Sequence, residues 1–185
     1  MKSALIALLA ICLCLPLIGD RDANKKFEAT KTKAAKGDAE AQSELGLMYE
    51  YGRGVKLNLK EAVKWHRKAA DQKDKESQFH LGMMYDFGRG VRQDSKEAVK
   101  WYHKSAEQGY VDAQYNLGVR YATGTGVQRD VLKAYVWWNL SMLNGNTVAG
   151  NNKLLIAEKM TPEQIAKAQE LSKEMVKKNP KLINE

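Results

Sequence analysis

A motif that recurs every 36 residues constrains this chain more than any other feature of its sequence. The stretch from Leu81 to Trp101 has counterparts in the same frame at Leu45 to Trp65 and at Leu117 to Trp137, with no gap between copies. A fixed period of this length is typical of solenoids, in which each repeat is one supersecondary unit that stacks on its neighbours. Nine positions are identical in all three copies, and in the first copy they are Gln42, Leu45, Gly46, Tyr49, Gly52, Gly54, Val55, Ala62 and Trp65.

Each repeat is predicted to begin with a helix that ends at a glycine loop. Ala41, Leu45 and Tyr49 lie four residues apart and therefore share one helical stripe. Gly46 lies beside that stripe, where a glycine costs about 1 kcal/mol relative to alanine. We therefore predict that a partner helix approaches closely at this position. The G-x-G-V loop ends the helix, because glycine adopts positive φ without steric penalty.

The second helix of each repeat has a recognisable start. Equivalent positions carry side chains that are good N-caps, namely Asn58, Asp94 and Asp130. Glu61 and Glu97 follow three residues later, which predicts a capping box in two of the repeats. Two helices of this size cannot bury their apolar faces alone, so the repeats must stack. We expect the tryptophan series to lie in the resulting core: Trp65, Trp101 and Trp137.

The pattern A-x-x-x-L-G-x-x-Y-x-x-G-x-G-V-x-x-[ND]-x-x-x-A-x-x-W resembles the Sel-one-like repeat, a relative of the tetratricopeptide repeat, over about residues 38–145. The resemblance implies an all-α, right-handed α/α superhelix of three helix pairs with helical caps. It also implies a protein–protein interaction module, with no enzymatic activity and no cofactor. The predicted divisions are a signal peptide at 1–19, an N-terminal capping helix at 20–36, repeats at 37–72, 73–108 and 109–145, and C-terminal capping helices at 146–185.

The first 19 residues resemble a secretory signal peptide. An unbroken apolar run covers residues 4–15 and ends before Pro16. This run is too short to span a bilayer, since a spanning helix takes about 20 residues. We predict cleavage after Gly19 and a bacterial periplasmic or secreted location, with an uncleaved anchor as the alternative. Cys12 and Cys14 are the only cysteines and both lie in the leader, so the mature chain would hold no disulfide. After cleavage of the leader we expect no stable membrane span.

Half-repeats are predicted to cap both ends of the array. Residues 23–35 match the register of a second helix and are expected to form an N-terminal capping helix. After the third repeat, residues 147–159 are expected to form another helix. Thr161, Pro162 and Gln164 then predict the start of a final helix, as the N-cap, N1 and N3 residues.

A partner-binding surface is predicted on the side of the first helices that faces away from the core. Steps of about 100° per residue from Leu45 place the positions of this surface opposite the buried stripe. Apolar residues exposed there would form a patch, and such patches usually indicate a partner. The alternative is that Phe79 and Tyr115 fill the seam between neighbouring first helices. The predicted residues are Ser43, Leu47, Glu50, Phe79, His80, Met83, Asp86, Tyr115 and Val119.

The net charge and the missing catalytic motifs indicate which kinds of partner and activity to expect. The net charge of +8 favours an acidic protein partner, bound by a monomer, over nucleic acid. In line with the resemblance, the partner would be an envelope, host or toxin protein that this chain neutralises or helps to assemble. His66, His80 and His103 show no metal-ligand spacing along the chain, and no G-x-S-x-G, S-x-x-K or phosphate-loop motif is present. The alternative function, a cell-wall or β-lactam hydrolase, is implied by a cysteine-rich branch of the same family, whose cysteine pairs this chain lacks.

Overall fold

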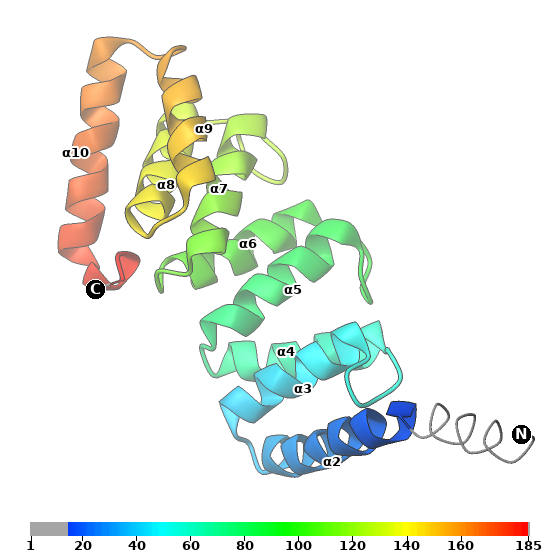
Figure 1. Cartoon of the computed structure of the whole chain (residues 1–185). Helices are drawn as coiled ribbons and strands as arrows, with labels where there is room; N and C mark the ends of the chain where they lie inside the picture. The colour runs from blue at the N-terminus through cyan, green and yellow to red at the C-terminus, as the bar shows by residue number, and fades with distance from the viewer. Residues whose placement is uncertain (1–14, 185) are drawn as a thin grey trace, which may run out of the picture.

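The structure is a computed structural model that describes the backbone of residues 15–184 and the side chains of residues 21–184 (Figure 1). Over that range the chain forms α-helices and one short 3-10 helix, with no strand. The predicted all-α superhelix is therefore confirmed. The helices are α2 (Leu15–Ala35), α3 (Ala39–Tyr51), α4 (Leu59–Asp71), α5 (Lys75–Phe87), α6 (Ser95–Ala106), α7 (Val111–Thr123), α8 (Val131–Leu143), α9 (Thr147–Ala157), α10 (Pro162–Lys178) and the 3-10 helix η1 (Pro180–Leu182).

The three repeats correspond to three helix pairs that stack into a curved array (Figure 1). The pairs are α3 with α4, α5 with α6, and α7 with α8. Helix α2 packs against α3 at one end of the array, and both α9 and α10 pack against α8 at the other end. Residues 1–14 of the predicted signal peptide lie outside the described residues, and α2 continues through Gly19, the predicted cleavage position. None of the helices within residues 15–184 is long and apolar enough to cross a membrane.

The second helices start where the sequence predicts, but both capping boxes expected there are wrong. Glu61 and Glu97 do have their backbone N–H groups capped by the preceding N-cap side chains. Their carboxylates, however, pair with Lys64 and Lys100, at 3.4 Å and 2.9 Å. A lysine one turn further along the helix competes successfully for an exposed carboxylate. The helix start predicted at Thr161 is confirmed, and Thr161 and Gln164 bond reciprocally there as a capping box.

The glycine inside each first helix has the packing reason that the sequence predicts. A ring from the paired second helix lies directly on it, so that a Cβ would approach the ring to less than 3 Å. Such a distance is shorter than side chains tolerate, and the helix pair can close only on a glycine. The Cβ distances would be 2.7 Å from Gly46 to His66, 2.5 Å from Gly82 to Tyr102, and 2.4 Å from Gly118 to Trp138.

The second glycine of each loop contacts the preceding repeat, which the sequence did not predict. Gly90 has a φ of +75°, and a Cβ there would lie 2.4 Å from the carbonyl oxygen of Leu59, at the start of α4. Gly126 meets Ser95 in the same way, and Gly54 meets Ala23 of α2. Because residue 23 is 36 positions before Leu59, α2 takes the place of a second helix, as predicted. These loops therefore form part of each joint between stacked repeats.

The tryptophan series lies in the core for two of its three members. Trp101 and Trp137 are each only 4% exposed, as predicted. Trp65, in the first repeat, is partly exposed, and the Nζ atom of Lys68 lies 4.1 Å from the centre of its ring. The neighbouring Trp138 is also buried, and its Nε1 donates a hydrogen bond to the backbone oxygen of Tyr115.

Candidate functional site

Five of the nine predicted partner-binding residues are buried, so the prediction that they face solvent is wrong. The paired second helix and the next repeat cover them. Phe79, for example, contacts the rings of Tyr102 in α6 and of Tyr110, the N-cap of α7, at centroid distances of 6.0 Å and 5.0 Å. The angular positions around a single helix distinguish the core side from the opposite side. They do not include the surface that the next repeat covers. The buried residues are Ser43, Glu50, Phe79, His80 and Asp86.

The other four predicted residues are partly exposed: Leu47, Met83, Tyr115 and Val119. Tyr115 and Val119 line a groove between the first helix of the third repeat, α7, and helix α9. Its volume is about 390 Å³. Leu155 of α9 also lines it and is 59% exposed. The rest of the lining comes from Ala122, Thr123, Trp138, Asn152, Ile156 and Lys159. Whether a partner binds in this groove stays a prediction.

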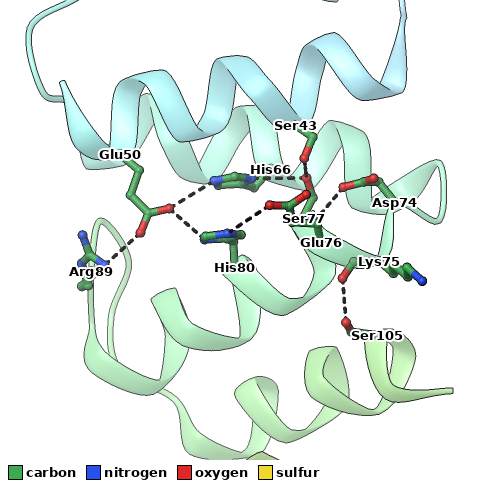
Figure 2. Close-up of polar contacts among 10 residues, drawn as sticks. All are labelled: Ser43, Glu50, His66, Asp74, Lys75, Glu76, Ser77, His80, Arg89 and Ser105. Carbon is green, nitrogen blue, oxygen red and sulfur yellow. Dashed lines mark hydrogen bonds and ion pairs between the residues drawn. The ribbon is translucent and has the colours of Figure 1, made fainter. Parts of the chain in front are cut away.

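A buried polar cluster lies between the first and second repeats (Figure 2). Glu50 of α3 is 1% exposed, and its Oε2 atom lies 3.3 Å from Nε2 of His66 and 3.0 Å from Nδ1 of His80. Arg89, from the loop after α5, donates a hydrogen bond of 2.8 Å to Oε1. The two imidazole rings are stacked, with centroids 4.9 Å apart and planes 5° from parallel. Three helices and one loop therefore converge on a single carboxylate.

The electrostatics of this cluster favour an ionised Glu50 beside a neutral His66. Burial acts to raise the pKa of the Glu50 carboxyl, but its contacts with His66 and His80 outweigh burial and hold that pKa well below its ordinary value. Burial lowers the pKa of the His66 imidazole, and the Glu50 carboxylate only partly offsets that effect.

Two serines extend the cluster, so that a serine, a histidine and a carboxylate follow one another as in a hydrolase triad. Nδ1 of His66 lies 3.3 Å from Oγ of Ser77, whose hydroxyl donates a hydrogen bond of 2.9 Å to Ser43. Serine, histidine and carboxylate are the parts of a nucleophilic triad, which needs an accessible hydroxyl. Ser77 has no exposed surface. The series of Ser77, His66 and Glu50 therefore gives no support to the hydrolase alternative.

The equivalent positions of the later repeats hold different chemistry. At the second joint, Asp86 replaces Glu50, accepts a hydrogen bond of 3.2 Å from the Tyr102 hydroxyl and pairs with Arg120. At the third, Ala122 and Trp138 take these places, so neither position carries a charge. Among the described side chains, the pair of stacked histidines thus belongs to the first joint.

Sequence spacing missed this cluster, because its members are distant along the chain. The repeat register held a usable signal. Residue 46 is the glycine that faces position 66, and Glu50 lies one helical turn further along, so Glu50 and His66 must be neighbours. The approach of His80 depends on how two repeats stack, and no spacing within one repeat encodes it.

Comparison with known proteins agrees with this architecture. The family model of the Sel1 repeat matches residues 39–74, 75–110 and 111–146, each unit starting two residues after the boundary predicted from the sequence. No curated protein sequence matches the chain.

Two solved structures are similar in fold and sequence. A protective antigen of uropathogenic Escherichia coli strains that displays an SLR fold is 29% identical over 83% of this chain, with a TM-score of 0.64. A Sel1 repeat protein from Oxalobacter formigenes is 30% identical over 78% of this chain, with a TM-score of 0.69. This chain spans 41% and 57% of those two chains, respectively. The match of the family model to three consecutive helix pairs shows that this chain belongs to the Sel1 repeat family.

Proposed function

We propose that this protein is a non-catalytic binding module that holds a segment of another protein in the groove between α7 and α9. Sel1 repeats generally mediate contacts between proteins, which agrees with the stacked array described above. The observation that carries the proposal is the apolar lining of this groove. Tyr115, Val119 and Leu155 present apolar or aromatic surface there, and Leu155 is largely uncovered.

The chemistry of the groove indicates what kind of segment fits. A few buried anchors, often aromatic, supply most of the binding energy in protein interfaces, and a polar rim surrounds them. Asn152 and Lys159 lie among the lining residues, and the chain as a whole carries a net charge of +8. The partner segment therefore carries apolar anchors next to acidic side chains, which the positive surface attracts.

We also propose that the protein acts in the bacterial periplasm or outside the cell, on an envelope, host or toxin protein. The signal-like leader supports this location, and so does the similarity to a protective antigen of uropathogenic Escherichia coli. The test is the mass of the chain recovered from periplasm and culture medium. A mass that corresponds to residues 20–185 supports the proposal, whereas an intact chain in the cytoplasm contradicts it.

The groove is tested with two neighbouring leucines of similar exposure. Leu155 lines the groove, whereas Leu154 is 63% exposed and is not among the lining residues. A protein captured from envelope extracts is purified, and its affinity is measured for the unchanged chain, for Leu155→Ser and for Leu154→Ser. We expect Leu155→Ser to weaken binding about tenfold or more, the effect of an interface anchor worth at least 1.4 kcal/mol. Leu154→Ser should bind normally. Equal affinities for all three chains would place the partner elsewhere.

A further inference from the structure

We infer that Glu50, His66 and His80 form a binding site for one zinc ion, which ties the first repeat to the second. The three residues offer one ligand atom each, and these atoms all lie within 4.8 Å of one another. Imidazole nitrogen and carboxylate oxygen are donors that Zn²⁺ prefers. The ligands come from α3, α4 and α5, so the ion would join helices of two different repeats (Figure 2).

The spacing of the ligand atoms suits a tetrahedral ion. Zinc bonds to nitrogen and oxygen are about 2.0–2.1 Å long, which places the ligand atoms of a tetrahedron about 3.3 Å from one another. Oε2 of Glu50 lies 3.3 Å from Nε2 of His66 and 3.0 Å from Nδ1 of His80. The two imidazole planes lie only 5° from parallel, so at least one ring would rotate for both lone pairs to point at one ion.

An unsatisfied atom points into the same place. Nδ1 of His80 is buried and has no hydrogen-bond partner, although it lies 3.0 Å from the Glu50 carboxylate. The residue as a whole is only 7% exposed. Buried polar atoms in folded proteins nearly always have a partner, and each exception needs a reason. A bound cation supplies that partner.

The contacts around His66 direct its ring toward Glu50. Nδ1 of His66 lies 3.3 Å from Oγ of Ser77, and Nε2 lies 3.3 Å from Oε2 of Glu50. With Nδ1–H donating to Ser77, the lone pair of Nε2 would be available to the ion, which would take the place of the proton between Nε2 and Oε2.

The outer contacts hold the ligands in place, as such contacts do in known metal sites. Ser77 fixes the orientation of the His66 ring, and Arg89 occupies Oε1 of Glu50, which leaves Oε2 for the ion. The Arg89 side chain is 36% exposed, so it connects the buried cluster to the surface. Three protein ligands leave the fourth position of the ion for a water molecule.

The test is zinc binding by the processed chain, purified without a histidine tag and stripped with a chelator. We expect about one Zn²⁺ per chain by equilibrium dialysis and a melting temperature that rises with zinc concentration, because an ion that binds the folded state stabilises it. His80→Gln should abolish both effects. Arg89→Gln, which keeps all three ligands, should weaken binding about 10–100-fold. His103→Gln, which alters a histidine outside the cluster, should change neither.

Two results would overturn the inference. One is a folded, unmodified chain that binds no zinc, in which case the cluster is only a buried hydrogen-bond network. The other is equal binding by His80→Gln, which places the ion elsewhere on the surface. If His80→Gln fails to fold, the imidazole ¹⁵N resonances of the unmodified chain decide. Zinc should shift those of His66 and His80 and leave those of His103 in place, and the opposite pattern refutes the site.

Discussion

The joint between the first and second repeats should be far more sensitive to a methyl group at Gly90 than at Gly88. Both glycines lie in the same loop with positive φ, at +75° and +66°. An alanine in this region costs about 1–2 kcal/mol at either position. At Gly88 the nearest atom to the added Cβ is 3.4 Å away, an ordinary contact. At Gly90 it is the backbone oxygen of Leu59, at 2.4 Å, which cannot rotate away.

Overpacking of this kind adds about 1–3 kcal/mol. Gly90→Ala should therefore lose about 2–5 kcal/mol of stability and Gly88→Ala about 1–2 kcal/mol, while the effect of alanine on the unfolded chain cancels in the comparison. Urea unfolding followed by circular dichroism measures both values, with a check that the slope m is unchanged, because stacked repeats can unfold in parts. Losses that agree within about 0.5 kcal/mol would show that the loop does not press on the preceding repeat, and the reasoning would fail.

Three further predictions follow from single residues. Lys73 has a φ of +68° at a position where the other units carry Gly37, Gly109 and Gly145, so Lys73→Gly should stabilise the protein by about 1 kcal/mol and raise its melting temperature by about 2–4 °C. Trp137→Ala should cost about 3–5 kcal/mol in urea unfolding, because this side chain is 4% exposed, and a cost below about 1 kcal/mol would contradict its place in the core. Burial and the nearby Lys133 lower the pKa of His103, so the unfolded chain binds a proton there before the folded chain does, and stability falls as pH drops below the ordinary value of 6.5. His103→Gln should reduce that slope between pH 6.5 and 5, and an unchanged slope would show that His103 does not cause it.

Much of this fold was predictable, because its repeated elements occur three times in the sequence and its terminal helices carry local signals of their own. Gly46 predicted a close helix pair, and the ring of His66 lies on it. Thr161 and Gln164 predicted a capped helix, and α10 begins there with both bonds. Such features depend on a few neighbouring residues, whose local chemistry is sufficient to define them.

The surface was harder to predict, because exposure depends on what the next repeat covers. Glu50 and Asp86 are charged residues opposite the core stripe, and both are buried by the stacking of neighbouring repeats. Leu155 was outside the predicted surface, because α9 lacks the glycine loop and was treated only as a cap. Which residues stay exposed therefore depends on how neighbouring repeats stack, and the sequence pattern within one repeat does not encode that stacking.

The chemistry of the joints changes along the array, from Glu50 with two histidines, to Asp86 with Tyr102, to Trp138 with no charge. In a stacked array, stability is the sum of the units and of the interfaces between neighbours, so unequal interfaces give the array a direction. At these positions the third joint carries Ala122 and Trp138, which do not titrate, whereas the first joint carries a carboxylate and two imidazoles. We expect the N-terminal repeat to open first when conditions change, while the groove between α7 and α9 stays folded and able to hold its partner.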